Sequence, residues 1–461
     1  MLLFRSVFLR AFSVLLLSLA IGCSAVPELG GPSPYVRSES PRVVSSQGEL
    51  SAARGEALLE RQDKKREPTL LDRHLANMQR ISDAPLVAGN AARLLIDGPA
   101  SYQAIFSAIG AARDHVNIET YILEGDEVGE KLSALLIEKQ AQGIQVNLLY
   151  DAVGSSGTSA EFFDRLRAGG VGVCEFNPFL PSRGRLADPN QRDHRKQVVV
   201  DGRVAISGGI NFSSVYSSGS AIGRRTKPES VTSGWRDTNI ELKGPAVAQF
   251  QELFMATWEK QSCPPLSGRE YFPALASQGD KVVRVIGSSS DDERGLMYLT
   301  LLSAIRESRQ SVHVTMAYFV PDAEIRVALE DASRRGVEVK LILPGISDSW
   351  IVLRAGQSYY GELLSAGVQI YELRGALLHA KTAVVDDVWS TVGSTNLDWR
   401  SFLYNDELNT SVLGLEFGRA MTAMFEADLR DATRIDLARW QDRAVGDWLE
   451  ERAARLFASW L

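Results

Sequence analysis

The chain contains little histidine and little cysteine: its 461 residues include five histidines and three cysteines. Cys23 directly follows an N-terminal leader, which leaves Cys174 and Cys263 as one potential pair. They either form a disulfide or remain two buried thiols, and the sequence does not decide between these states. No group of Cys, His and carboxylate residues has the spacing of metal ligands, so we predict neither a metal nor a cofactor.

The chain also lacks a surplus of positive charge and a long hydrophobic run. Its net charge is −7, whereas proteins dedicated to nucleic acids usually carry a basic surplus, so we predict no nucleic-acid partner. The apolar run at 11–21 has about half the length that a membrane-spanning helix needs. With 45% hydrophobic and 23% charged residues the composition is globular, and the length predicts two domains and a tail.

The N-terminus has the features of a secretory signal peptide at 1–22. Arg5 and Arg10 precede the apolar run, and small residues precede Cys23. The segment Ala-Ile-Gly-Cys23 resembles the lipobox of bacterial lipoproteins, in which the cysteine becomes the lipidated first residue. Acyl chains on Cys23 would anchor the protein durably to a membrane. We therefore expect an exported, lipid-anchored protein that faces the periplasm, and Ser24 in place of aspartate favours the outer over the inner membrane.

Two of the five histidines lie in the same short pattern, H-x-K-x-x-x-x-D. It occurs at His194–Asp201 and again at His379–Asp386. A given histidine meets both partners at these offsets in about 1 of 400 cases at average composition, so two accidental matches are improbable. Two imidazoles and two ammonium groups in a duplicated pattern indicate phosphate chemistry. Asp201 and Asp386 are grouped with the catalytic residues, although their place at strand ends, before turns, favours scaffolding.

The sequence around the two patterns is itself repeated. The helix-to-strand segment "AIGAARDHVNIETYIL" has a counterpart in "LLSAIRESRQSVHVTMAYFV", and the strand "GIQVNLLYD" has one in "GVEVKLILPG". Helices that alternate with buried strands predict an α/β fold. We expect domains at 86–270 and 271–430, a tether at 23–85 that is helical only in part, and an amphipathic helix at 431–461. His74, in the tether, is expected on a solvated polar face.

Within each pattern the histidine and the lysine share one face of a strand, because they lie two residues apart. His194 thus accompanies Lys196, and His379 accompanies Lys381. One imidazole can attack phosphorus while the other protonates the leaving oxygen, and the ammonium groups can hold the charged oxygens. This scheme requires no metal.

Two further pairs of polar residues recur at matched positions in the halves. Asn211 and Asn396 follow the two patterns and are candidates to hold phosphate oxygens. Asp237 and Glu407 each lie two residues before another asparagine, in the strand that comes next. We expect one of these carboxylates to orient each imidazole, with solvated surface carboxylates as the alternative.

These segments resemble the phospholipase D superfamily and, within it, bacterial cardiolipin synthases. The likeness extends from about residue 90 to the C-terminus and includes "NIETYI", "LLYDAVGS", "DHRKQVVVDG", "WRDTNIELKGPAV", "LHAKTAVVDD" and "VGSTNLDWRSF". It implies two pseudo-symmetric α/β/α sandwich domains that form one shared active site. Cardiolipin synthases commonly carry two N-terminal transmembrane helices, in place of which this chain has the leader described above.

The resemblance also implies roles for individual residues. His194 would be the nucleophile that forms a phosphohistidine, and His379 would protonate the leaving alcohol and later deprotonate the attacking one. An exchange of these two roles stays open, because the duplicated site is nearly symmetric. The positions that match phosphate-holding residues of the family are Lys196, Lys381, Asn211 and Asn396, with Ser213 and Ser394 as further candidates.

The activity implied is transfer of a phosphatidyl group from one phospholipid to a hydroxyl of another. Phosphatidylglycerol as donor and acceptor would give cardiolipin and glycerol, and phosphatidylethanolamine is a further candidate substrate. Hydrolysis to phosphatidic acid is the alternative, and a non-catalytic lipid-binding lipoprotein is the alternative of another class. A nuclease would share the chemistry, but the acidic balance and the leader weigh against it. Whether the protein is a monomer or a homodimer stays open.

The last residues of the chain combine aromatic and charged side chains. Trp440, Trp448, Phe457 and Trp460 recur there among arginines and glutamates. This pattern is typical of a helix that lies in a membrane interface, so we expect contact with a membrane surface. Packing of the same side chains against the body of the protein is the alternative.

Overall fold

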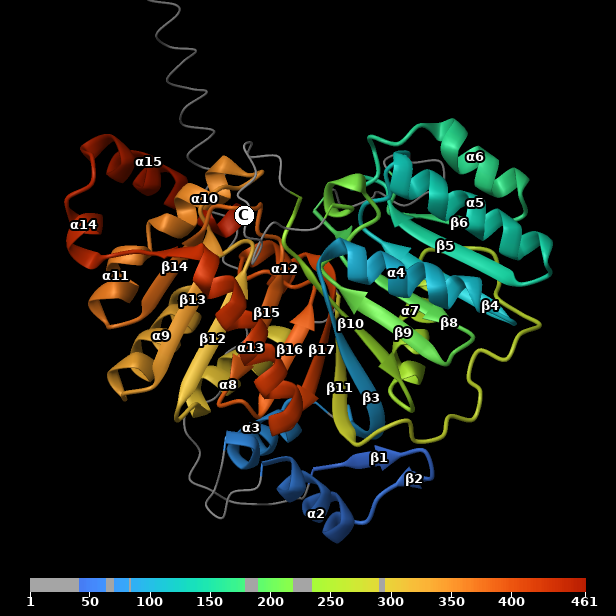
Figure 1. Cartoon of the computed structure of the whole chain (residues 1–461), viewed down its shortest axis with the longest axis horizontal. Coiled ribbons are helices and arrows are strands. Elements are labelled where there is room, and N and C mark those ends of the chain that lie inside the picture. The colour runs from blue at the N-terminus through green and yellow to red at the C-terminus, as the bar shows by residue number, and fades with distance from the viewer. Residues whose placement is uncertain (1–40, 64–69, 83, 179–189, 219–233, 290–294) are drawn as a thin grey trace, which may run out of the picture.

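The structure is a computed structural model, and it describes residues 41–461 except 64–69, 83, 179–189, 219–233 and 290–294. The predicted signal peptide, Cys23 and the first part of the tether therefore lie outside the described residues. Two halves of like topology stand side by side, each with a sheet between layers of helices (Figure 1).

The first half is built on a mixed sheet. Strands β4, β5 and β6 are parallel, whereas β8, β9 and β10 continue the sheet in antiparallel order. Alternate side chains of β8 pack on opposite faces: Val198 and Val200 face the core with α4 and α5, and Val199 faces the core with α7. The elements are β3 (Leu86–Ile96), α4 (Asp97–Gly110), β4 (His115–Thr120), α5 (Glu127–Ala141), β5 (Gln145–Asp151), α6 (Ala160–Ala168), β6 (Gly172–Phe176), β7 (Arg192–Asp193), β8 (Gln197–Val200), β9 (Val204–Gly208), η2 (Ser214–Tyr216), β10 (Thr238–Lys243) and α7 (Val247–Lys260).

The second half repeats this plan. Its parallel strands are β12, β13 and β14, and its antiparallel strands are β15, β16 and β17. The elements are β11 (Lys281–Ser288), α8 (Leu296–Glu307), β12 (Ser311–Met316), α9 (Ala323–Arg334), β13 (Glu338–Pro344), α10 (Trp350–Gln357), α11 (Tyr360–Ser365), β14 (Gln369–Leu373), β15 (Lys381–Val385), β16 (Trp389–Gly393), α12 (Trp399–Leu403), β17 (Asn405–Leu413) and α13 (Leu415–Asp431).

The two halves meet along the strands that begin each of them. β3 pairs antiparallel with β11, and the flanking strands β10 and β17 pair with β3 and β11 respectively. Each neighbour on one side of this seam has its counterpart on the other side, which gives the molecule an approximate two-fold axis (Figure 1). Valines of β8 and β15, Val199 and Val384, share one apolar core with α7 and α13. The predicted α/β fold with two related domains is confirmed.

Much of the predicted tether is folded. Residues 43–79 form β1 (Val43–Ser45), β2 (Gly48–Glu49), α2 (Ala52–Asp63) and α3 (Leu70–Gln79), with 64–69 outside the description. β1 pairs with β3, and α3 buries Leu71 and Leu75 in the core of the second half. The expectation of a solvated His74 is wrong, because its ring is buried beside Trp389 and its Nδ1 lies 3.1 Å from Ser303 Oγ. The apolar stripe of α3 faces the body, and His74 lies within it.

The C-terminal residues do not form the single helix that we expected at 431–461. They form β18 (Ala432–Arg434), α14 (Leu437–Gln441), α15 (Val445–Arg455) and η3 (Ala458–Trp460). β18 pairs with the edge strand β14, which holds these residues extended, and Asp436 starts α14 by accepting a hydrogen bond from the Arg439 N–H. Local pairing and capping therefore divide the amphipathic stretch.

The state of the two remaining cysteines, which the sequence left undecided, is seen in the structure. Cys174 in β6 and Cys263 after α7 form a disulfide, with Cα atoms 5.8 Å apart. It fastens the outer strand of the first half to the helix behind it. None of the helices described here is long and apolar enough to cross a membrane.

Burial of His74 predicts a dependence of stability on pH. Burial and the charge of Arg284 lower the pKa of His74 to about 3, from the ordinary value of 6.5. The unfolded chain therefore binds a proton that the folded chain excludes as the pH falls below about 6.5, and at pH 5 this costs on the order of 2 kcal/mol. His74→Gln should lose less stability than the wild type between pH 7.5 and pH 5 in urea unfolding. Equal losses in both proteins would contradict the buried, neutral imidazole.

Candidate active site

The first histidine is positioned by a backbone contact between the halves. β7, which leads into the first pattern, pairs in parallel with the start of β17, and the His194 N–H donates to the Asp406 carbonyl at 2.8 Å. The side chain of the next residue of β17, Glu407, therefore faces the imidazole. Its two carboxylate oxygens each lie 3.0 Å from His194 Nδ1, and Ser394 Oγ donates to Oε2 of the same carboxylate.

The second histidine is positioned by the corresponding contact on the other side of the approximate two-fold axis. The Arg236 N–H donates to the Leu377 carbonyl, and the His379 N–H donates back to the Arg236 carbonyl, both at 2.8 Å. Asp237 follows Arg236, and its Oδ2 lies 2.7 Å from His379 Nδ1. Each histidine is thus paired with a carboxylate of the other half.

These pairs determine which ring nitrogen is available. Each neutral imidazole donates a hydrogen bond from Nδ1–H to a buried carboxylate, which leaves Nε2 as the unprotonated, basic nitrogen. Both carboxylates are fully buried and hold fixed positions. Gly209 leaves the room that Asp237 needs, because a Cβ at this position would overlap the carboxylate. Arg236, the residue before Asp237, is itself held by a bidentate hydrogen bond to Asp428 of α13, at 2.9 and 2.7 Å.

Each lysine lies beside its histidine, where the chain enters β8 or β15. Lys196 Nζ donates to the His194 carbonyl at 2.6 Å, and Lys381 Nζ donates to the His379 carbonyl. Each ammonium group uses one of its three donors in this way, which leaves donors for an anion. Asn211 is linked to the second histidine through Tyr216: its Nδ2 donates to Tyr216 Oη at 3.4 Å, and that hydroxyl lies 3.2 Å from His379 Nδ1.

The charges of the two halves act on one another. Burial lowers the pKa of His194 to about 4, Glu407 opposes this, and both Lys196 and Lys381 add to it. Burial likewise lowers the pKa of Lys196 to about 7. The pKa values of His379 and Lys381 are lowered as well, first by burial. Two imidazoles and two ammonium groups therefore share one buried space that would favour an added negative charge.

The structure gives structural contacts to four of the residues that we grouped with catalysis or phosphate binding. Asp201 and Asp386 adopt left-handed backbone conformations. Their carboxylates accept the backbone N–H groups that lead into β4 and β12, from Arg113, Asp114 and His115 and from Arg309, Gln310 and Ser311. They stabilise the scaffold, as their position before turns favours. Ser213 and Ser394 direct their hydroxyls to carboxylates, those of Glu124 and Glu407.

Three aromatic residues at the site were missed in the sequence. The Tyr121 ring packs edge-on against His194, with centroids 5.1 Å apart, and Lys196 Nζ lies 5.2 Å from the centre of the same ring. Trp235 packs against His379, and Tyr216 Oη lies 3.2 Å from His379 Nδ1. Tyr121 and Trp235 lie in the segments "NIETYI" and "WRDTN", so their place beside matched motifs was an available signal. Tyr216 had none.

Comparisons with known proteins agree with this geometry. The chain matches the family described as "Cardiolipin synthase, PLD-like domain" over residues 105–219 and 301–429. It is 34% identical to a cardiolipin synthase of Geobacillus thermodenitrificans over 388 residues, which cover 84% of this chain and 75% of that protein. It is 36% identical to cardiolipin synthase A of Pseudomonas aeruginosa over 360 residues, or 78% and 71% of the two chains. Among solved structures, phosphatidylserine synthase of Haemophilus influenzae shares the fold with a TM-score of 0.57 at 12% identity, over 83% of this chain and 98% of that one.

The crossed pairing predicts a selective change in histidine tautomers. Glu407→Gln should disturb the Nδ1-protonated form of His194 and leave His379 unchanged, and Asp237→Asn should do the reverse. Nitrogen-15 NMR of histidine side chains at pH 7 can separate these cases, since only five histidines need assignment. A change at His379 caused by Glu407→Gln alone would contradict the pairing across the halves.

Proposed function

This chain belongs to the family of cardiolipin synthases with a phospholipase D-like domain, and we propose that it makes cardiolipin from two molecules of phosphatidylglycerol. The observation that carries the proposal is the pair of imidazoles, each held by a buried carboxylate, beside two buried ammonium groups. A nucleophile, an acid and a cationic cradle are what cleavage of a phosphodiester needs.

In the first step, His194 Nε2 attacks the phosphorus of the donor lipid. The bond from phosphorus to the glycerol headgroup oxygen breaks, and His379 transfers its proton to that oxygen, so that free glycerol leaves. The phosphatidyl group remains on His194 as a phosphohistidine. The low pKa of His194, about 4, keeps this imidazole unprotonated at neutral pH, as a nucleophile must be.

In the second step, a glycerol hydroxyl of another phosphatidylglycerol attacks the phosphohistidine. His379, now neutral, accepts the hydroxyl proton, the new bond from oxygen to phosphorus forms, and the bond from phosphorus to His194 breaks. The products are cardiolipin and the regenerated site. Water in place of the second lipid would give phosphatidic acid through the same residues.

The charged residues support both steps. Lys196, Lys381, Asn211 and Asn396 would hold the phosphoryl oxygens, on which negative charge accumulates. The negative phosphodiester itself would raise the pKa of His379 and so favour the protonated acid when the substrate binds. Phosphatidylethanolamine carries the same phosphodiester and is a further candidate donor.

We further propose that the protein works from the periplasmic side, anchored through a lipid on Cys23, with the outer membrane favoured. The N-terminal sequence supports this proposal, and it lies outside the described residues. The described surface adds a second feature that would hold the enzyme against a bilayer.

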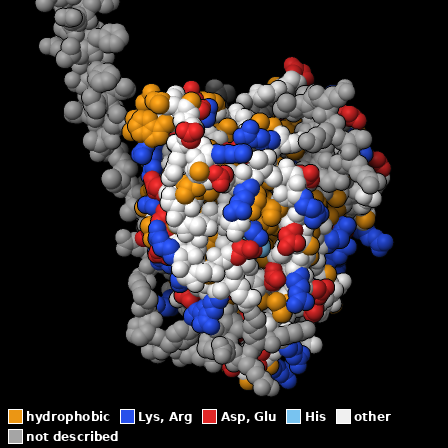
Figure 2. Space-filling model, turned by 60° about the vertical axis from the view of Figure 1, so that its left-hand side comes forward, with side chains coloured by type: hydrophobic (Ala, Val, Ile, Leu, Met, Phe, Trp, Pro, Cys, Tyr) orange, Lys and Arg blue, Asp and Glu red, His pale blue; other side chains and the backbone are white. Residues whose placement is uncertain are grey.

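That feature is an apolar surface formed by the start of α10 and by the C-terminal segment. We call it the aromatic edge, and it consists of Trp350, Val445, Trp448, Leu449, Leu456, Phe457 and Trp460, which are between 44% and 77% exposed. The ion pairs of Arg354 with Asp447 and Glu450, both at 3.1 Å, fasten α15 to α10. Figure 2 shows hydrophobic side chains gathered near the upper edge of this side of the molecule, next to basic ones. Exposed tryptophan, phenylalanine and leucine beside arginine are typical of surfaces that enter the headgroup region of a membrane.

Two sets of contacts lead from the neighbours of the aromatic edge toward the active site. Trp350 lies two residues after Asp348, whose carboxylate accepts a hydrogen bond from Tyr318 at 2.8 Å and whose charge acts on Lys381. The terminal Leu461 carbonyl accepts a hydrogen bond from the Arg400 N–H, four residues after Asn396. A bilayer at this edge would bring phospholipid headgroups to the two histidines.

The proposed reaction predicts a product. The purified enzyme with phosphatidylglycerol should form cardiolipin and glycerol in equal amounts, measured by mass spectrometry of the lipids. His194→Ala and His379→Ala should each lower the rate by about 1,000-fold or more, because each removes a proton-transfer or covalent step. His313→Gln is the matched control, since this histidine contacts Glu338 and Phe425. Phosphatidic acid as the sole product would refute cardiolipin synthesis and favour hydrolysis.

The aromatic edge predicts membrane binding without the lipid anchor. In a Cys23→Ser background, the protein should float with vesicles of phosphatidylglycerol and phosphatidylethanolamine, and Trp350→Gln with Trp448→Gln and Trp460→Gln should lower the bound fraction about 10-fold. Phe272→Gln, at a position that is 50% exposed elsewhere, should bind like the parent. Equal binding of the triple variant would assign the membrane contact to another surface.

A further inference from the structure

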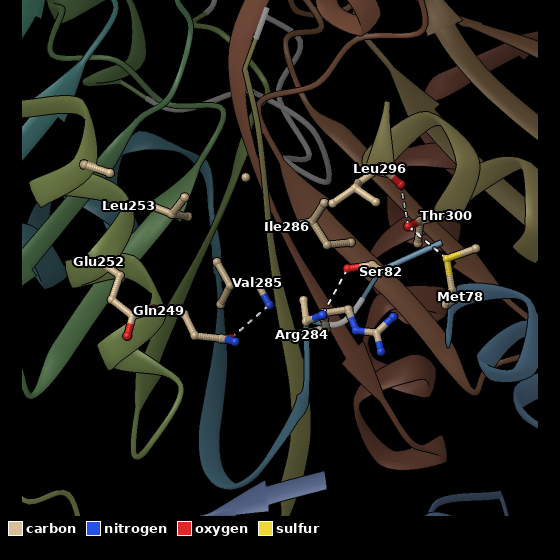
Figure 3. A pocket seen from close by; sticks show the side chains of 13 residues that line it. Met78, Ser82, Gln249, Glu252, Leu253, Arg284, Val285, Ile286, Leu296 and Thr300 are labelled. Carbon is tan, nitrogen blue, oxygen red and sulfur yellow. Dashed lines mark hydrogen bonds between the residues drawn. The ribbon is translucent and has the colours of Figure 1, made fainter. Parts of the chain in front are cut away.

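A cleft lies between the halves, away from His194 and His379. It has a volume of about 310 Å³ and is lined by α7 of the first half, by β11 and α8 of the second half, by α3, and by Ser82 and Ala84. Its apolar walls are Met78, Leu253, Ile286 and Leu296 (Figure 3). The volume is at the lower end of the range for small-molecule sites.

Arg284 of β11 supplies the only guanidinium among the described residues that line this cleft. Its side chain is buried, with 7% of the residue exposed, and its Nε has no hydrogen-bond partner. Figure 3 shows the side chain reaching from β11 toward Ser82 and Met78. Burial lowers the pKa of Arg284 to about 10, and within the described part of the chain no carboxylate opposes this effect.

This arginine differs from the other buried arginines. Arg236 forms its two-fold hydrogen bond with Asp428, and Arg195 donates to Thr257 and to the Ser288 carbonyl, both at 2.7 Å. A buried cation without a partner is unfavourable by several kcal/mol relative to a paired one. The position therefore lacks an anion, and the open cleft gives an anion access to it.

The surroundings restrict the kind of anion. Gln249 Oε1 accepts from the Val285 N–H at 3.3 Å, which leaves its Nε2 to donate, and the Ser82 hydroxyl can donate as well. Glu252 stands at the exposed rim on α7, on the opposite side from Arg284 (Figure 3). One cation and one nearby carboxylate favour an anion with a single charge, and the apolar walls favour a ligand with a short hydrocarbon part.

We propose that this cleft binds a monoanionic oxyanion with a short apolar group, the oxyanion on Arg284 and the apolar group against Leu253, Ile286 and Leu296. The carboxylate of a short fatty acid and the phosphodiester of a lipid headgroup both have this chemistry. The site is separate from the histidines. Ser288 of β11 pairs in register with Glu407, and Arg284 lies four residues along the strand, about 13 Å away.

The test measures the melting temperature of the full-length protein with four probes. Hexanoate stands for the carboxylate and diethyl phosphate for the phosphodiester, while hexanol and hexylammonium lack the negative charge. At saturation we expect one or both anions to raise Tm by about 3 °C and the other probes to leave it unchanged. The anion with the larger shift identifies the source of the ligand.

Three variants make the test specific. Arg284→Met should abolish the shift and leave the Tm without ligand equal or higher, because an unpaired buried charge is removed. Arg306→Met, on helix α8, which lines the cleft, but paired at the surface with Glu324, should respond like the wild type. Ala256→Phe fills the exposed rim without a change of charge and should also abolish the shift. No shift with either anion, or an undiminished shift in Arg284→Met, would overturn the proposal.

Discussion

The site depends on one interaction made twice, the hydrogen bond between a histidine of one half and a buried carboxylate of the other. Neither half contains a complete pair: His194 needs Glu407, and His379 needs Asp237. The backbone arranges this exchange, since the segment that leads into each pattern pairs with the strand that carries the partner. The seam between β3 and β11, the shared core beneath it and the Arg236–Asp428 pair hold the halves in the register that the exchange requires.

Burial then determines the protonation states. Desolvation lowers the pKa of both imidazoles and both ammonium groups, so the free site resists carrying the positive charge that its composition suggests. An arriving phosphodiester would supply negative charge and stabilise the protonated forms of His379 and of the two lysines. The negative charge that binds the substrate would therefore also activate the general acid.

The sequence predicted the outline of the molecule well. The repeated pattern of helix and strand led to the α/β fold with two related domains, and the motifs around His194 and His379 led to the family. Each lysine lies beside its histidine as expected, although His194, Lys196 and His379 come just before β8 and β15 and not within a strand. Periodicity and short motifs are local properties of the sequence and do not depend on which distant segment packs against them.

What the sequence could not predict depends on packing between distant segments. The exchange of carboxylates between the halves follows from the docking of β7 on β17, which leaves no local mark. His74 looked solvated because its neighbours are polar, yet α3 turns that side toward the body. The pairing of Cys174 with Cys263 and the division of the C-terminal stretch by β18 likewise depend on a neighbouring element. The roles of the site residues in catalysis stay predictions.

The exchange of carboxylates also limits how the two halves can change over evolutionary time. After a duplication, one copy is usually free to drift while the other preserves the function. Here neither copy has that freedom, because a substitution in one half is felt at the histidine of the other. The partners differ by one methylene group, glutamate for His194 and aspartate for His379. Pairs of positions that lie more than 140 residues apart in the chain are thus expected to vary together in relatives.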